Sequence, residues 1–203
     1  MHKPKPRLAI FASGRGSNAE ALMHAFERGF LPAELALVVS NKSQAPVLEI
    51  AQKHGYPIAC IPNEGLPREK HELQVLEAIR QAEINHIVLA GYMRILGPEF
   101  LNTFPSRVLN IHPSLLPEFR GMHAVEQQWK AGVRVAGATV HVVTPEIDSG
   151  PIILQGSITV DAAEGLEALK HRILTEVEHQ VYPRAVWLFV QRQYGSLTSE
   201  QLP

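Results

Sequence analysis

The sequence lacks the features of a disulfide-bonded, secreted or membrane-spanning protein. Its one cysteine, Cys60, has no partner for an internal disulfide. The longest apolar run, residues 185–190, is far shorter than the roughly 20 residues of a membrane-spanning helix. A basic stretch, 1–7, precedes an apolar run, 8–12, that is too short for a signal peptide. These absences predict a soluble cytoplasmic protein.

An excess of charge of either sign is also missing. Nineteen basic residues balance twenty acidic ones, and the net charge of −1 argues against a nucleic-acid binder that works by bulk charge. With 203 residues, 45% of them apolar, the chain has a globular composition. Its length predicts a single domain over 1–203, with a core at about 8–190 and loose ends at 1–7 and 195–203.

Short apolar runs alternate with amphipathic segments in the first half of the chain. Five runs predict buried strands: Leu8–Ala12, Leu35–Val39, Ile58–Ile61, His86–Ala90 and Arg107–Ile111. Helical spacing of apolar residues falls between them, at 18–28, 46–54 and 68–82. This order predicts an α/β fold, in which an open, mostly parallel, twisted sheet carries helices on both faces.

The second half of the chain has a different pattern. Two further strands, 136–143 and 152–160, are separated only by the turn-rich stretch 144–151, so they should be antiparallel. A long helical region follows at 165–190, and Pro183 should kink or restart it. The expected fold is therefore Rossmann-like, with an antiparallel C-terminal part.

The loop after the first strand, Ser13-Gly-Arg-Gly-Ser-Asn18, opens a predicted helix. Gly14 and Gly16 should adopt backbone angles open mainly to glycine, and free N–H groups at a helix N-terminus suit a phosphate. The glycine spacing also fits a dinucleotide fingerprint, but Ser40-Asn41 stands where that site needs an acidic residue. An ordinary tight turn, with Ser17 or Asn18 as helix cap, remains the alternative.

Asn110 and His112 alternate at the end of the fifth predicted strand, so their side chains point the same way. An amide and an imidazole on one face suit the oxyanion that forms during acyl transfer. The alternative is a capped strand end with a packed histidine. Asp148 lies in the 145–151 turn and matters only if that turn folds back over His112, where it could accept a proton.

Two other chemistries are weakly supported. The histidines at 112, 123, 141 and 179 do not have the spacing of a His-Glu-x-x-His metal helix, and Cys60 offers no thiolate pair, so no metal is expected. No Gly-x-Ser-x-Gly elbow is present for a serine nucleophile.

Seven blocks together resemble the folate-dependent phosphoribosylglycinamide formyltransferase family over about residues 8–183. They are Ser13–Asn18, Val39–Lys42, Leu89–Leu96, Asn110–Pro117, Gly137–His141, Asp148–Pro151 and Glu178–Pro183. The resemblance implies transfer of a formyl group from 10-formyltetrahydrofolate to the amine of glycinamide ribonucleotide in purine biosynthesis. It implies small-molecule partners, no nucleic acid, membrane or metal, and either a monomer or a homodimer.

The resemblance also assigns residues. Asn110, His112 and Asp148 would be catalytic. The substrate phosphate and ribose would contact Arg15, Gly16, Ser17, Asn18 and Glu178. The folate would contact Arg68, Met93, Arg94, Ile95, Leu96, Asn110, Ile147 and Asp148.

Three related enzymes and one non-enzyme remain as alternatives. A formyltetrahydrofolate hydrolase would use the same Asn, His and Asp set with water as acceptor, but the first strand begins by Leu8 and leaves no room for its N-terminal domain. A methionyl-tRNA or a sugar-nucleotide formyltransferase should be longer. A phosphate-ligand-binding module would use the first loop only and give His112 and Asp148 no role.

Overall fold

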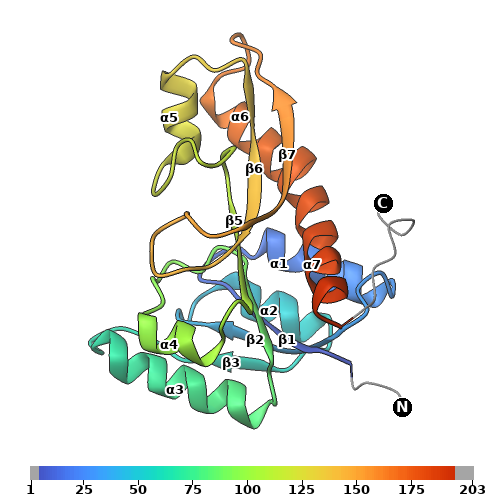
Figure 1. Ribbon diagram of the computed structural model, residues 1–203, viewed down its shortest axis with the longest axis vertical. Helices are drawn as coiled ribbons and strands as arrows, with labels where there is room; N and C mark the ends of the chain where they lie inside the picture. The colour runs from blue at the N-terminus through green and yellow to red at the C-terminus, as the bar shows by residue number, and fades with distance from the viewer. Residues whose placement is uncertain (1–4, 195–203) are drawn as a thin grey trace.

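The structure is a computed structural model that describes residues 5–194 (Figure 1). The predicted loose ends at 1–4 and 195–203 lie outside the described residues. Arg7, predicted to be loose, instead begins the first strand, where its backbone N–H donates to Asn85 Oδ1 at 2.9 Å. Within 5–194, no helix is long and apolar enough to cross a membrane.

One seven-stranded sheet runs through the molecule in the order β3-β2-β1-β4-β5-β6-β7. Its strands are β1 (Arg7–Phe11), β2 (Glu34–Ser40), β3 (Ile58–Cys60), β4 (His86–Leu89), β5 (Val108–His112), β6 (Val135–Val142) and β7 (Ile152–Thr159). Strands β1 to β5 pair in parallel, whereas β6 pairs antiparallel with both β5 and β7. The predicted mostly parallel sheet with an antiparallel C-terminal part is confirmed.

Helices cover both faces of this sheet. They are α1 (Ser17–Glu27), α2 (Pro46–Lys53), α3 (Arg68–Gln81), α4 (Pro98–Thr103), α5 (Ala124–Lys130), α6 (Leu166–Arg172), the π-helical segment η1 (Ile173–Glu178) and α7 (His179–Tyr194). One apolar core joins β1 to α1, α2, η1 and α7, and the other joins β1 to α3 and α4. Leu8 and Ile10 belong to the first core, Ala9 and Phe11 to the second, and all four side chains are fully buried. Burial on both faces explains why β1 is continuously apolar.

The predicted C-terminal helical region is confirmed, because α6, η1 and α7 follow one another without a break. Of the two effects predicted for Pro183, a kink or a restart, the restart does not occur, because α7 continues through the proline to Tyr194. The irregular turn is η1, which ends at Glu178, one turn before the proline. Such π-helical turns occur often at functional sites, and Glu178 is one of the residues assigned to the substrate.

The strand order reverses between β1 and β4, which places the loops that follow these two strands side by side. The Ser13 N–H donates to the Gly91 carbonyl at 3.0 Å, so the 13–16 loop touches the start of the 91–97 loop. In open α/β sheets, ligands bind at this reversal, beyond the carboxyl ends of the strands. The fold therefore brings the predicted phosphate loop to the predicted folate loop.

Candidate active site

Gly16 fixes the shape of the loop that follows β1. Its φ is +83°, and a β-carbon there would lie 2.7 Å from Cβ and Cγ2 of Val47 on α2. Only glycine fits both the angle and the contact. The expectation for Gly14 is wrong, because that residue has no positive φ and nothing lies within 4 Å of its β-carbon position. Arg15 between them is exposed.

Among residues 5–194, no side chain caps α1. Gly16 is its N-cap residue, so the predicted cap by Ser17 or Asn18 is wrong. Asn18 Nδ2 instead donates to Glu178 Oε2 at 2.5 Å, while Asn18 Oδ1 is buried without a hydrogen-bond partner among residues 5–194. Burial raises the pKa of Glu178, and the bond from Asn18 opposes that rise. The helix N-terminus and a buried amide oxygen are thus both available to a ligand.

Ser13 connects the two loops at the strand reversal. Its hydroxyl donates to Asn41 Oδ1 at 2.5 Å and accepts from the Met93 N–H at 2.7 Å. Asn41 is 1% exposed, so this link is anchored in the interior. The Ser40-Asn41 pair that argued against a dinucleotide site therefore has a structural role here.

The 144–151 turn folds back over the end of β5, as the proton-transfer hypothesis requires. Asp148 Oδ2 lies 3.2 Å from His112 Nδ1 and accepts from the Gly121 N–H at 2.9 Å. His112 Nε2 lies 2.8 Å from the Phe119 carbonyl, so both nitrogens of this imidazole face acceptors. The geometry thus suits an N–H donor at either ring position.

A buried hydrogen-bond network fixes the segment between His112 and Phe119. The Thr139 hydroxyl on β6 donates to the Ser114 carbonyl at 2.7 Å and accepts from the Leu116 N–H at 3.0 Å. The Ser114 hydroxyl donates to the Glu118 carbonyl at 2.6 Å. Since these groups are buried, losing one partner would leave the others unsatisfied. The network thereby holds the Phe119 carbonyl that orients His112.

His141 is the residue of this cluster to which the sequence assigned no catalytic role. It faces Asn110 across the β5–β6 pair, and its Nε2 lies 3.3 Å from Asn110 Nδ2 and 3.4 Å from Asp148 Oδ1. Burial alone would raise the pKa of Asp148. Hydrogen bonds from His141 and the Gly121 N–H, together with imidazole charge, hold that pKa below its usual value. Asp148 is therefore ionised at neutral pH.

The Asn110–Asp148–His141 cluster lies against a cleft of about 520 Å³. Four of the large apolar side chains that line the cleft are exposed: Met93, Ile95, Met122 and Ile147. Arg94 and the buried Leu96 line it as well. An exposed apolar rim around convergent polar groups is typical of a small-molecule site.

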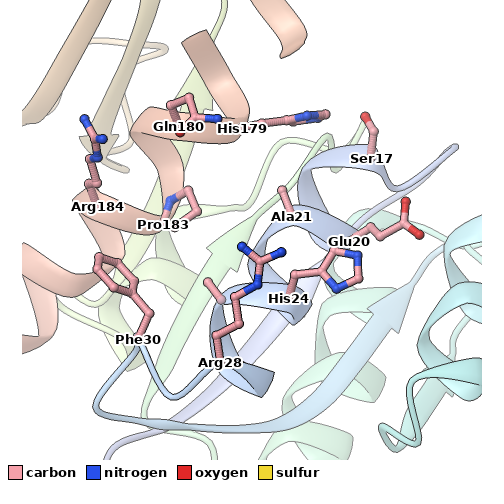
Figure 2. Close-up of a pocket in the computed structure, with 11 residues that line it drawn as sticks. Ser17, Glu20, Ala21, His24, Arg28, Phe30, His179, Gln180, Pro183 and Arg184 are labelled. Atoms are coloured by element: carbon pink, nitrogen blue, oxygen red, sulfur yellow. The ribbon is translucent and has the colours of Figure 1, made fainter. Parts of the chain in front are cut away.

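The remaining candidates lie outside this cleft. Arg68, at the start of α3, packs beside Gly97, with its Nε 3.3 Å from the β-carbon position of that glycine. His123 is the exposed N-cap residue of α5. His179 lines a second cavity, of about 720 Å³, between α1 and α7 (Figure 2). That cavity lacks the His–Asp–Asn set.

A family model described as formyl transferase matches residues 6–186. The chain belongs to the formyl transferase family. A phosphoribosylglycinamide formyltransferase of Bacillus subtilis is 41% identical over 89% of this chain and 92% of its own length.

Solved structures agree with this assignment. The crystal structure of glycinamide ribonucleotide transformylase 1 from Symbiobacterium toebii has a TM-score of 0.89 and 39% identity, covering 93% of this chain and 89% of that one. A formyltetrahydrofolate deformylase from Pseudomonas syringae shares the fold, with a TM-score of 0.86 and 30% identity, covering 93% of this chain but 62% of that one. The fold and the formyl-transfer family are thus established together.

Proposed function

We propose that this chain transfers the formyl group of 10-formyltetrahydrofolate to the amine of 5′-phosphoribosylglycinamide, in purine biosynthesis. One observation carries the proposal: the uncapped N-terminus of α1 follows β1 at the strand reversal, and the loop after the neighbouring β4 lines the cleft that Asn110 and Asp148 also line. The names of the relatives at 41% and 39% identity support the same reaction.

The ribonucleotide would bind at the start of α1. Its phosphate would accept from the backbone N–H groups of Gly16, Ser17 and Asn18, with the helix dipole and the exposed Arg15 adding positive potential. The ribose hydroxyls would donate to Glu178 and to the unpartnered Asn18 Oδ1. These contacts position the glycinamide amine and take no part in bond making.

The folate would bind in the 520 Å³ cleft. Its flat ring would cover Leu96 and the exposed Met93, Ile95 and Ile147, because burying apolar surface at that rim is favourable. Backbone groups of the 93–96 loop, which includes Arg94, would read the ring edge. Arg68, outside the cleft, would reach the acidic tail of the cosubstrate.

The chemistry would be a direct acyl transfer. The amine attacks the formyl carbon, and the carbonyl electrons move to the oxygen, which Asn110 and the His112 imidazolium stabilise. The 3.2 Å separation of His112 Nδ1 from Asp148 is long for a charge-assisted bond, so the Nδ1–H can also donate to an oxyanion that forms beside this carboxylate. Asp148, directly or through a water, accepts the proton of the attacking nitrogen and passes it to the folate nitrogen. The bond between that nitrogen and the formyl carbon then breaks, the carbonyl re-forms, and tetrahydrofolate leaves as a neutral amine.

A formyltetrahydrofolate hydrolase is the second candidate, because the Pseudomonas deformylase shares the fold. Hydrolysis needs no phosphate or ribose site. The part-buried Asn18–Glu178 pair, in which burial raises the pKa of Glu178, favours the ribonucleotide as formyl acceptor. If water were the acceptor, this pair would have no ligand to bind.

The test follows consumption of 10-formyltetrahydrofolate with and without glycinamide ribonucleotide. We expect turnover only when the ribonucleotide is present, and none with His112→Gln. His123→Gln, an exposed histidine outside the cleft, is the matched control and should keep full activity. Equal consumption without the ribonucleotide would establish the hydrolase and overturn the proposal. Ribonucleotide binding without turnover would point to a phosphate-ligand-binding module.

A further inference from the structure

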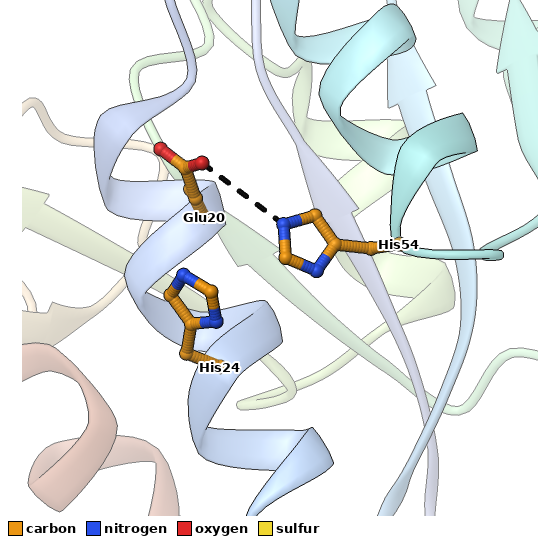
Figure 3. Close-up of side chains that lie close together, drawn as sticks. All are labelled: Glu20, His24 and His54. Carbon is orange, nitrogen blue, oxygen red and sulfur yellow. Dashed lines mark ion pairs between the residues drawn. The ribbon is translucent and has the colours of Figure 1, made fainter.

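A second polar cluster lies away from the active site, where α1 passes the end of α2. Glu20, His24 and Glu27 follow at spacings of four and three along α1, so they share one face of the helix. His54, the C-cap residue that follows α2, reaches toward Glu20 and His24 (Figure 3). No catalytic residue belongs to this cluster.

The Glu27 carboxylate contacts Nδ1 of both imidazoles in the cluster. Its Oε1 lies 2.6 Å from His54 Nδ1 and its Oε2 lies 3.1 Å from His24 Nδ1. These bonds from His54 and His24 keep the pKa of Glu27 below its usual value, so its carboxylate is ionised. The rings of His24 and His54 meet edge to face, with centroids 4.9 Å apart. Because Nδ1 of each ring contacts Glu27, Nε2 of each ring is the atom that could bind a metal ion.

The remaining carboxylate completes the arrangement. His54 Nε2 lies 4.0 Å from Glu20 Oε1, and one ligand atom each from Glu20, His24 and His54 falls within 4.8 Å of the others. Around a tetrahedral zinc ion with bonds of about 2.0–2.2 Å, ligand atoms lie about 3.4 Å apart. The side chains of Glu20 and His24 are about half exposed, so small rotations of these side chains can bring the ligand atoms from the observed separations to the shorter ones that zinc requires.

We propose that Glu20, His24 and His54 form a binding site for a divalent transition metal ion, best suited to Zn²⁺. Two imidazoles and one carboxylate are a common zinc ligand set, with solvent at the fourth position. Glu27 would act as the outer carboxylate that fixes the tautomer and orientation of both histidines.

The site is open to solvent and lies on α1, the helix that follows the phosphate loop. Glu20 and His24 also line the cavity between α1 and α7, where Arg28 and Arg184 are the cationic neighbours (Figure 2). A bound ion would join α1 to α2, the two helices that meet through Gly16 and Val47 at the other end of α1. Metal binding would therefore stabilise the packing that shapes the phosphate loop.

The test is a Zn²⁺ titration of the whole chain after treatment with a chelator. We expect one saturable Zn²⁺ site per chain and a rise in Tm with the metal. His54→Gln and His24→Gln should each weaken binding at least tenfold. Glu27→Gln, which keeps all three ligands, should weaken it 10- to 100-fold. His123→Gln should change nothing.

Two results would overturn the site. One is the absence of saturable Zn²⁺ binding by the unmodified chain. The other is binding that survives both histidine variants, or that disappears with His112→Gln instead. The Tm of each metal-free variant checks that it folds, and Glu20→Gln, a change on the exposed face of α1, replaces any variant that does not.

Discussion

The loop at residues 13–18 depends on a glycine conformation at Gly16, whereas the turn at 144–151 depends on hydrogen bonds to the side chain of Asp148. In the first, Gly16 has a left-handed backbone conformation pressed against Val47. In the second, Asp148 has a φ of +48° without being glycine, and its carboxylate is held by Gly121 and His141. One region presents backbone N–H groups, and the other presents a charged side chain.

This difference fits the tasks that we propose for the two regions. A phosphate is bound by fixed N–H groups, which need a rigid loop and no titratable residue. Proton transfer needs a carboxylate whose ionisation is controlled by its neighbours. Damage to the loop should therefore appear in ribonucleotide affinity and stability, and damage to the turn in the rate of the chemical step.

Asp148→Asn should have the largest effect on the rate. The amide cannot accept the proton, so we expect kcat to fall by roughly 10²–10⁴. The Kd for the ribonucleotide should change by less than about threefold, since Asp148 lies outside the α1 site. Steady-state kinetics with a direct binding titration measures both, and equal losses would argue against proton transfer.

Gly16→Ala should damage the other region. The positive φ and the contact with Val47 together should cost about 2–4 kcal/mol, which lowers Tm by roughly 5–15 °C. Ribonucleotide affinity should fall more than tenfold, because the N–H groups move. Gly14→Ala is the matched control, since its β-carbon position is open. A thermal melt in which the two variants are alike would contradict this account of the loop.

Asn18→Ala should have a smaller effect, confined to binding. It removes an acceptor aimed at the ribose and the donor to Glu178, so we expect KM for the ribonucleotide to rise roughly tenfold with kcat nearly unchanged. A fall in kcat with unchanged KM would instead place Asn18 in the chemical step.

Glu178→Gln should have the smallest effect, and it separates stability from binding. Because folding raises the pKa of this carboxyl, its contribution to the free energy of unfolding is most favourable at low pH. That contribution is lost as the pH rises through the pKa of the carboxyl in the folded protein. The glutamine variant should therefore melt a few degrees higher at pH 7, with the difference vanishing near pH 4. Melting curves across pH 4–8 measure this, and a lower Tm at pH 7 would refute it.

The strands could be predicted from the sequence because each is an apolar run that ends in turn residues. The helices α4 and α5 were missed, since six and seven residues are too few to show a helical period. No residue in the sequence marks the π-helical turn before Pro183, whereas a proline in a helix is a recognisable signal for a break. The turn packs against β6 and β7, and these tertiary contacts leave no pattern in the sequence.

The proximity of Asp148 to His112 could be predicted because both residues stand in blocks that resemble the formyltransferase family. The contacts of His141 could not, since they depend on the register that sets it opposite Asn110. The available signals were its place in the Gly137–His141 block and its alternation with Thr139 along the sixth strand. His24 and His54, thirty residues apart, meet only because α1 packs on α2. Residues that only the tertiary structure brings together have no characteristic spacing in the sequence.

One measurement tests most directly whether the 13–18 loop serves binding and the 144–151 turn serves the chemical step: single-turnover formyl transfer at saturating folate and ribonucleotide. Saturation removes the binding contribution, so Asn18→Ala should transfer the formyl group at close to the unmodified rate. Asp148→Asn should be slower by at least a hundredfold. Equal slowing of both variants would show that the two regions act as one unit, and would contradict the account.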